Sequence, residues 1–365
     1  MVLVARLRTR SKGRVGRGAV LLSISVLFLG PVLSACGQSG AGLARVSFLP
    51  DPSANGKGWH WSARCQFGPD TNKTCEASDP KLRAAQLDGD EWNLGGGAAT
   101  AGSLGMYVSS PGTLLMQGDF PSTPPCTQST CLAPSAYTWV RGFPNVLYGI
   151  DQCHTASSPP ESHLLPLPMK VGAIPSDLIG TTTYSAHAAL VTYDVAYDLW
   201  LNKSGTKKAC RTNGTLEVMV WTDYDARALL PGSMEVGTAS IPFAINGVVK
   251  SGKQAWAIYA SNVYGNGRTA PWGGTVWLVL NQAETVSNGA VSVDLSSALS
   301  AVGTLLEHNY GWHDFRRTYW LDSIPFGMEY GPESGTLTGA GSSYFSLKLS
   351  SYCLDVGTKL AQAGC

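Results

Sequence analysis

Charged residues are scarce in this sequence, and neither sign of charge dominates. Asp, Glu, Lys and Arg make up 14% of the 365 residues, whereas about a quarter is usual for a soluble domain. The 26 basic and 25 acidic residues leave a formal net charge of +1 at pH 7. Because such a chain has no basic field to attract phosphates, nucleic-acid binding is disfavoured.

The spacings typical of metal sites are absent from the sequence as well. The six His show no H-x-x-x-H arrangement, and no pair of Cys combines C-x₂-C spacing with clustered His. We therefore predict no metal site in this protein.

No long amphipathic helix pattern and no internal repeat runs through the chain. Instead, 42 Gly and 21 Pro separate short runs that are typical of strands, for example residues 189–193, 255–259, 275–281 and 344–349. Many short strands with Gly and Pro turns predict a β-sandwich or β-barrel. One helix is predicted over residues 295–308, where apolar residues recur at helical spacing.

Residues 1–36 resemble a bacterial export signal of the lipoprotein type. A positively charged start precedes an apolar run over residues 20–33, which is shorter than the roughly 20 residues that a membrane span needs. The run ends in Leu33-Ser34-Ala35-Cys36, which is similar to a lipobox, where the Cys becomes the lipidated N-terminus. We predict a lipid anchor on Cys36, giving a membrane-anchored or extracellular location, with residues 37–85 as a tether and extension. Ordinary cleavage, with Cys36 incidental, is the alternative.

The other cysteines predict disulfides. Setting Cys36 aside from nine Cys leaves eight, and an even number in an exported chain favours a disulfide framework, although eight cysteines allow 105 pairings. Close spacing favours three short loops and leaves one distant pair: Cys65 with Cys75, Cys126 with Cys131, Cys353 with Cys365, and Cys153 with Cys210.

Residues 216–221 are typical of a β-strand with two chemically different faces. Side chains alternate with a period of two along a strand, which gives one aliphatic, core-seeking face of Leu216, Val218 and Val220. The opposite face carries Glu217, Met219 and Trp221. A carboxylate, a thioether and an indole make a poor core, but they suit the floor of a sugar-binding cleft.

Two further runs are predicted to place a carboxylate on the polar face of a strand. In residues 195–200, Asp198 shares a face with Trp200. In residues 324–329, Glu329 shares a face with Gly327, and a small residue beside a carboxylate leaves room for a ligand. The other face of the second run is core-like and consists of Ile324, Phe326 and Met328.

The order and spacing of several short segments carry a family resemblance. They include Glu91-Trp92-Asn93, Gly142-Phe143-Pro144-Asn145-Val146, Ala196-Tyr197-Asp198-Leu199-Trp200, Glu217-Val218-Met219-Val220-Trp221 and Gly327-Met328-Glu329. Together they resemble glycoside hydrolase family 12, the small endoglucanases and xyloglucan hydrolases. The resemblance implies an all-β jelly-roll sandwich of two antiparallel sheets with a concave substrate cleft, one short helix and a catalytic domain over residues 86–365.

The resemblance also implies roles for individual residues. Glu217 would be the nucleophile of a retaining mechanism, Glu329 the general acid and base, and Asp198 the residue that orients Glu217. Retaining carboxylates lie about 5–5.5 Å apart, and the two need different pKa values. Met219 would lie beneath the sugar, while three Trp rings would stack on glucosyl units: Trp92, Trp139 and Trp221.

The chain departs from the family pattern in ways that leave its substrate open. The extension before residue 86 is longer than the resemblance covers, and Glu333 is a rival to Glu329 as acid and base. We predict a monomer that hydrolyses a β-1,4-linked glucan internally, with cellulose-like, mixed-linkage and xyloglucan chains all open. The alternatives are a surface-anchored carbohydrate-binding or cell-wall protein without catalysis, and a hydrolase of another polysaccharide such as envelope glycans.

Overall fold

The computed structural model describes twelve stretches of the chain, and all statements below concern them. They are residues 43–46, 75–77, 86–91, 103–109, 113–120, 142–149, 165–205, 213–228, 234–250, 255–271, 273–332 and 343–363. They belong to one compact unit, Gln38–Cys365. The predicted export signal with Cys36 lies outside the described residues, and so do three of the cysteines predicted to form disulfides, Cys65, Cys126 and Cys131.

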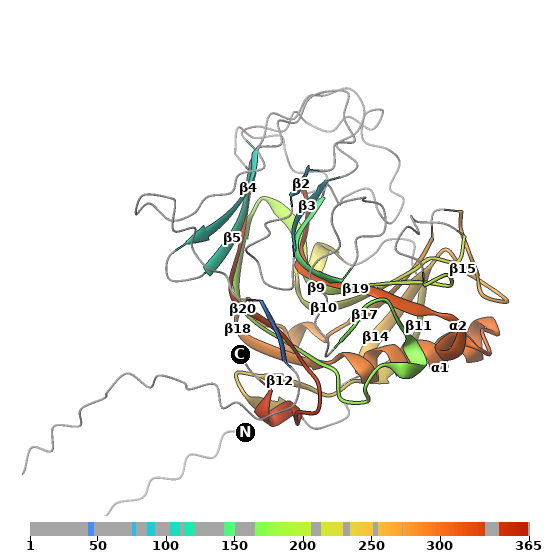
Figure 1. Cartoon of the computed structure of the whole chain (residues 1–365). Coiled ribbons are helices and arrows are strands. Elements are labelled where there is room, and N and C mark those ends of the chain that lie inside the picture. The colour runs from blue at the N-terminus through green and yellow to red at the C-terminus, as the bar shows by residue number, and fades with distance from the viewer. Residues whose placement is uncertain are drawn as a thin grey trace, which may run out of the picture. The chain divides into compact units, whose positions relative to one another are not determined.

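One sheet contains eight strands (Figure 1). In spatial order they are β13 (Val248–Lys250), β12 (Phe243–Ile245), β18 (Asn288–Asp294), β8 (Ile179–Ala189), β20 (Ser343–Asp355), β5 (Thr113–Phe120) and β4 (Ser103–Ser109), with β1 (Leu43–Val46) also paired to β20. All of its pairings are antiparallel. We call it the back sheet, because its neighbour carries the acidic side chains described below.

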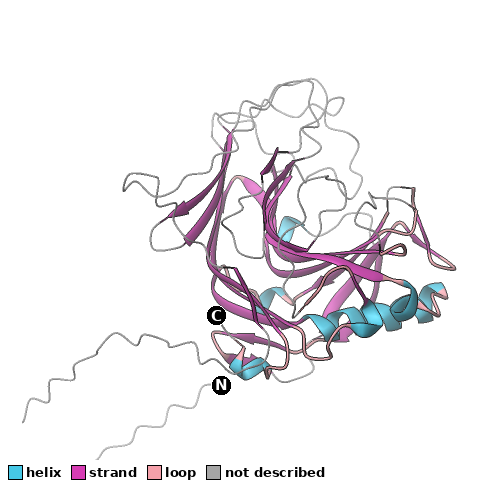
Figure 2. Ribbon diagram, viewed as in Figure 1, coloured by secondary structure: helices cyan, strands magenta, loops and turns pink. Residues whose placement is uncertain are grey.

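The second sheet, called the front sheet, contains ten strands. Their order is β11 (Met234–Ser240), β14 (Ala255–Ser261), β17 (Gly274–Val279), β10 (Leu216–Tyr224), β9 (Val191–Asn202), β19 (Trp320–Pro332), β6 (Gly142–Gly149), β3 (Gln86–Glu91) and β2 (Cys75–Ala77), with β7 (Met169–Lys170) paired to β19. A small separate ladder joins β15 (Val263–Tyr264) to β16 (Arg268–Thr269). Strands therefore dominate the described chain (Figure 2).

The predicted all-β jelly-roll sandwich is confirmed, with one difference in strand direction. β10 and β17 pair in parallel, Leu216 opposite Gly274 and Trp221 opposite Val279, whereas the prediction had two purely antiparallel sheets. Parallel neighbours need a long crossover connection. Here the chain between the two strands supplies it, because it first builds β11 and β14 before returning beside β10.

The main core lies between the two sheets and is rich in aromatic rings. Tyr197 of β9 and Phe326 of β19 come from the front sheet, and their ring centroids are 4.7 Å apart. Tyr352 of β20 approaches Phe326 from the back sheet at 6.5 Å. All three are fully buried, and burying a large apolar side chain contributes about 1.5–3 kcal/mol. This contact holds the two sheets together directly behind the polar face of β9 and β19.

The predicted helix is confirmed as α1 (Leu295–Tyr310). The Asp294 side chain caps its first turn by accepting a 2.9 Å hydrogen bond from the Ser297 amide. It ends two residues beyond the predicted boundary, because Gly311 adopts the left-handed conformation (φ 67°) that terminates a helix. A further one-turn helix, α2 (Phe315–Thr318), and four short 3-10 turns are present: η1 (Val171–Ala173), η2 (Ala226–Ala228), η3 (Gln282–Glu284) and η4 (Leu360–Gln362).

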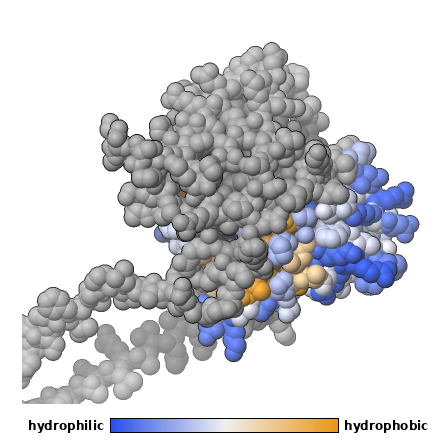
Figure 3. All heavy atoms as spheres, viewed as in Figure 1, coloured by the Kyte–Doolittle hydropathy of each residue, from blue (hydrophilic) through white to orange (hydrophobic). Residues whose placement is uncertain are grey.

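The inner side of α1 belongs to the main core, while its outer side is polar. Val302 and Leu306 are fully buried, and Thr304, Glu307 and His308 are exposed. Figure 3 shows a mainly hydrophilic surface in the region of α1 and α2. Among the described residues, no helix has the length and hydrophobicity that a membrane crossing requires.

One predicted strand is wrong as a single element. Residues 189–193 form an unbroken β-like run in the sequence, but β8 ends at Ala189 and β9 begins at Val191. Leu190 between them has a φ of 56°, in the left-handed region that a β-strand cannot contain. The chain passes here from the back sheet to the front sheet, a turn that the side chains alone do not reveal.

The described cysteines give a partial view of the disulfides. Cys353 lies fully buried in β20 and is disulfide-bonded. Its predicted partner, Cys365, lies outside the described residues, as do Cys153 and Cys210. The predicted pairings therefore stay predictions.

Candidate active site

The two faces of β10 separate as the sequence predicts. Leu216, Val218 and Val220 are fully buried in the core between the sheets. Met219 and Trp221 face the other way and belong to a second, smaller apolar cluster on the outer face of the front sheet. Glu217 shares that outer face by the alternation of the strand. We call this the acidic face, because four further carboxyl groups lie on it or beside it.

Glu217 is held by a neighbouring strand. In the parallel ladder it lies opposite Thr275 of β17, and the Thr275 hydroxyl donates a 2.7 Å hydrogen bond to Glu217 Oε2. Only 8% of Glu217 is exposed. A hydrogen bond to a carboxylate is stronger than one between neutral groups and fixes the rotamer of the acid. Glu217 is therefore oriented before any ligand binds.

Asp198 enters the acidic face from β9, on the other side of β10. It lies opposite Met219, and its neighbour on the same face, Trp200, lies opposite Glu217. Asp198 is 3% exposed. The antiparallel register therefore places Asp198 diagonally next to Glu217.

Glu329 reaches the same face from β19, two strands away from β10. It lies opposite Asp194 of β9 in the ladder that joins the two strands. Glu329 is 6% exposed and Asp194 is fully buried. The structure thus brings Glu217, Asp198 and Glu329 onto one face of three adjacent strands, and it adds Asp194 to them.

Burial and mutual repulsion control the charge of this cluster. Burial is the largest cause that raises the pKa of Asp194 well above its usual value, and the charges of Asp198, Glu217 and Asp223 raise it further. The neighbouring Glu329 carboxyl acts in the opposite direction and lowers the pKa of Asp194. The charges that raise this pKa therefore come from both β9 and β10.

A fifth carboxyl, Asp223, lies at the end of β10. The Tyr193 hydroxyl donates a 3.2 Å hydrogen bond to Asp223 Oδ2. Burial raises the pKa of Asp223, and the bond from Tyr193 partly counters that rise. Tyr193 is affected in turn, because burial and the nearby charge of Asp223 raise the pKa of its hydroxyl. Tyr193 therefore stays protonated and remains a donor at neutral pH.

The aromatic side chains of the face differ in their exposure. Trp221 and Trp277 are essentially buried, and the Trp221 ring packs against Tyr224 with centroids 5.7 Å apart. Trp200 and Tyr259 are partly exposed. The ring of Trp221 thus has a packing role in the structure, and its predicted stacking on a sugar stays a prediction.

Gly327 is explained by strand packing. A Cβ atom at this position would lie 2.3 Å from the Pro144 carbonyl oxygen and 2.7 Å from Asn145 Cβ. Both neighbours belong to β6, which pairs Asn145 with Gly327. The sequence interpretation, that the small residue leaves room for a ligand, therefore needs correction: the glycine permits the close approach of β6 to the strand that carries Glu329.

Several predicted site residues fall outside the described part of the chain. Trp92, Trp139 and the rival acid Glu333 are among them. Conversely, sequence reasoning missed Thr275 and Asp194. The sequence did contain a signal for Asp194, because strand alternation places it on the same face as Ala196 and Asp198, two and four residues later. The signal was missed because the predicted strand over residues 189–193 ended just before Asp194.

In a buried cluster of this kind, one carboxyl group can stay protonated while its neighbour is ionised. Burial and mutual repulsion make it unfavourable for all of the groups to be ionised at once. That division provides a nucleophile and a general acid on one surface. In the described part of the chain, no group of three or more His, Cys, Asp or Glu is arranged to hold a metal ion.

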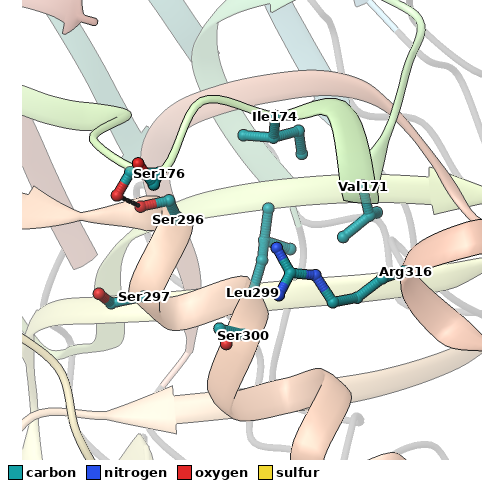
Figure 4. Close-up of a pocket in the computed structure, with 8 residues that line it drawn as sticks. All are labelled: Val171, Ile174, Ser176, Ser296, Ser297, Leu299, Ser300 and Arg316. Atoms are coloured by element: carbon teal, nitrogen blue, oxygen red, sulfur yellow. Dashed lines mark hydrogen bonds between the residues drawn. The ribbon is translucent and has the colours of Figure 1, made fainter. Parts of the chain in front are cut away.

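A hollow of about 200 Å³ lies away from this face, between η1 and the start of α1 (Figure 4). Its walls include Ile174, Leu299 and Arg316 together with four Ser side chains. Ser296 closes one end by donating a 2.6 Å hydrogen bond to the Ser176 carbonyl. The described residues of the lining include no carboxylate, so they cannot supply the acid and base of a hydrolase. The acidic face is the better candidate for chemistry.

The fold is similar to that of a solved xyloglucanase. A native family 12 xyloglucanase from Bacillus licheniformis is 15% identical, with a TM-score of 0.51 over 80% of this chain and 98% of that chain. The same xyloglucanase in complex with ligand gives the same values. No family model and no curated protein matches the sequence. The family resemblance noted from the sequence is thus confirmed at the level of the fold.

Proposed function

We propose that the protein is a retaining glycoside hydrolase that cleaves β-1,4-linked glucans internally. One observation carries the proposal: Glu217, Asp198 and Glu329 converge on one face of three adjacent strands, although 131 positions separate Asp198 from Glu329 in the chain. Such a convergence of buried carboxyl groups opposes stability, so a catalytic reason for it is favoured. The shared fold with a xyloglucanase supports the same class of substrate.

Glu217 is the proposed nucleophile. Its carboxylate attacks the anomeric carbon while Glu329 gives its proton to the glycosidic oxygen, and the bond between that carbon and oxygen breaks. In the second step Glu329, now ionised, removes a proton from water. The water oxygen attacks the anomeric carbon and releases Glu217. The hydrogen bond from Thr275 supports this role by holding Glu217 Oε2 in one orientation.

The remaining roles concern the sugar and the orientation of the nucleophile. Asp198 orients Glu217 from the adjacent strand, and Met219 lies beneath the sugar next to the reaction centre. Trp92, Trp139 and Trp221 form stacking platforms, because an aromatic face complements the C–H face of a pyranose. The concave substrate cleft is proposed to lie over the acidic face. The chemistry itself needs no metal ion or organic cofactor.

The test is a panel of polysaccharides scored by the release of reducing ends. Residues 37–365 should act on at least one of barley β-glucan, carboxymethylcellulose and xyloglucan, and NMR should show retention of anomeric configuration. Glu217→Gln and Glu329→Gln should each abolish turnover, whereas the exposed helix variant Glu307→Gln serves as the matched control and should be unaffected. Glu333→Gln discriminates between the rival acids. Retardation in an affinity gel without turnover would instead identify a carbohydrate-binding protein.

The N-terminal segment carries a separate proposal. Cys36 is lipidated and anchors an exported monomer at the cell surface, with residues 37–85 as a tether. The lipobox-like residues Leu33-Ser34-Ala35-Cys36 support it. Cys36→Ala should move the protein from the membrane fraction to the soluble fraction. Continued membrane association of that variant would refute the anchor, and gel filtration of residues 37–365 tests the monomer.

A further inference from the structure

A row of side chains crosses the front sheet from the acidic face toward its β11 edge. Trp277 of β17 lies opposite Met219 of β10 on one side and opposite Tyr259 of β14 on the other. Tyr259 in turn lies opposite Glu235 of β11. We propose that Tyr259 and Glu235 form a sugar-binding subsite at the β11 end of this row. The inference rests on the proposed function, because it requires a glucan chain that lies across the strands.

Strand alternation places both side chains on the same outer face as the acidic residues. In β14, Trp256 and Ile258 are buried in the main core, so the next residue, Tyr259, points to the outer side. Glu235 lies directly opposite Tyr259, and residues opposite each other in an antiparallel pair share a face. The extra residue of the β-bulge that follows, Val236, packs instead against the main core.

Tyr259 combines a supported ring with an accessible surface. It packs against the smaller apolar cluster of the outer face, which contains Met219 and Trp277. It is partly exposed, whereas Trp221 and Trp277 are essentially buried. Burial raises the pKa of the Tyr259 hydroxyl, and the charge of Glu235 raises it further, so the ring stays neutral at neutral pH. Tyr259 therefore offers a stacking surface that the buried ring of Trp221 lacks.

The chemistry of the pair suits a pyranose ring. An aromatic face complements the C–H face of a sugar, and a carboxylate accepts hydrogen bonds from hydroxyl groups. Glu235 is exposed and belongs to the strand that ends the front sheet on this side. Hydrogen bonds to a charged acceptor are stronger than those between neutral groups. Tyr259 thus supplies the stacking surface, and Glu235 supplies a polar contact that orients the sugar.

The place of the pair in the sheet sets its distance from the reaction centre. The strands β10, β17, β14 and β11 follow one another in the front sheet (Figure 1). Neighbouring strands lie about 4.8 Å apart, so β14 is roughly 10 Å from β10. Two linked glucosyl units of an extended β-1,4 chain cover a similar length. Tyr259 therefore holds a sugar beyond the ring at Glu217, and only chains long enough to reach it bind more tightly.

The first experiment measures binding without cleavage. In a Glu217→Gln background, calorimetry gives the affinities for cellohexaose and cellotriose with and without Tyr259→Ala. The added change should weaken cellohexaose binding about 10-fold and leave cellotriose binding nearly unchanged. Tyr259→Phe, which keeps the ring, should preserve the affinity for the longer chain. Equal weakening for both sugars, or no weakening for cellohexaose, would overturn the proposal.

Tyr344→Ala is the matched control, because Tyr344 is also a partly exposed tyrosine but belongs to β20 of the back sheet. It should leave both affinities unchanged, and a loss equal to that of Tyr259→Ala would overturn the proposal. Glu235→Gln tests the second member of the pair at an exposed position, where folding should be undisturbed. It should weaken binding of cellohexaose and not of cellotriose, and an unchanged affinity for cellohexaose would refute the pair.

Turnover separates this inference from the proposed function. If the wild type cleaves glucans but Tyr259→Ala keeps the same preference for long chains, the subsite fails and the proposed function stands. If the wild type cleaves no glucan but binds cellohexaose more tightly than Tyr259→Ala does, the proposed function fails and the subsite stands.

Discussion

Thr275 and Glu217 lie opposite each other in a parallel pair of strands, and the hydroxyl of one donates a 2.7 Å hydrogen bond to the carboxylate of the other. The parallel ladder between β10 and β17 produces this contact. Because the two strands are 58 positions apart at this point, a residue that no local pattern connects with Glu217 fixes the orientation of the proposed nucleophile.

Replacing Thr275 by Val should therefore weaken catalysis more than folding. Valine has nearly the same shape but lacks the hydroxyl, and a hydrogen bond to a charged group contributes about 1.5–3 kcal/mol. We expect kcat to fall about 10- to 100-fold. Thr275→Ser, which keeps the donor, should recover most of the activity. Full activity in Thr275→Val would show that the bond does not serve catalysis.

Gly327→Ala should destabilise the front sheet and displace Glu329. The added Cβ would collide with the Pro144 carbonyl, which is backbone and cannot turn away. Overpacking of this kind costs about 1–3 kcal/mol. The change is measured as a lower denaturation midpoint together with reduced kcat in the folded protein. Gly247→Ala serves for comparison, because a Cβ there would meet nothing within 4 Å. That variant measures only the cost of the positive φ of Gly247, without any collision.

Phe326→Ala should cost about 3–5 kcal/mol of unfolding free energy. Phe326 is fully buried between Tyr197 and Tyr184, at centroid distances of 4.7 and 5.6 Å, and its removal leaves a cavity behind β19. Phe326→Leu, which retains most of the volume, should cost clearly less. Denaturant unfolding measures both, and a loss below about 1 kcal/mol for Phe326→Ala would mean that the aromatic cluster does not hold the sheets together.

Stability should fall as pH rises, because Asp194 has a pKa raised by burial. Above about pH 4 the unfolded chain releases a proton that the folded protein still binds, so unfolding releases protons and becomes easier as pH increases. For one proton, the free energy of unfolding falls by at most about 1.4 kcal/mol per pH unit. It stops falling once the pH exceeds the pKa of Asp194 in the folded protein. Urea unfolding across this range should show a flatter dependence for Asp194→Asn. Equal slopes would contradict the shift.

Much of the active face could be predicted because strand alternation is a local property. A period of two assigns Leu216, Val218 and Val220 to the core and places Glu217, Met219 and Trp221 together, and the structure confirms this division. The same reasoning placed Asp198 and Glu329 on polar faces of their strands. Helix α1 was predictable for a similar reason, since its apolar spacing lies within one short segment.

The contacts across strands could not be predicted in the same way. The left-handed turn at Leu190 divides what the sequence presents as one run over residues 189–193. Ending that predicted run at residue 193 then left Asp194 apart from Asp198, although both lie in β9. The collision that requires Gly327 involves β6, which is distant in the chain. In each case the deciding neighbour belongs to a segment whose register is set by the packing of two whole sheets.

The sequence by itself determined which side chains each strand offers to its two faces, because backbone pleating fixes that alternation within a few residues. Only the tertiary structure decided which faces meet. It set Thr275 against Glu217 through a parallel pairing and Asp194 against Glu329 through the β9–β19 register. The physical reason is that hydrogen-bonded ladders join residues by position in space, and closing the sandwich around its aromatic core selects one register for every strand at once.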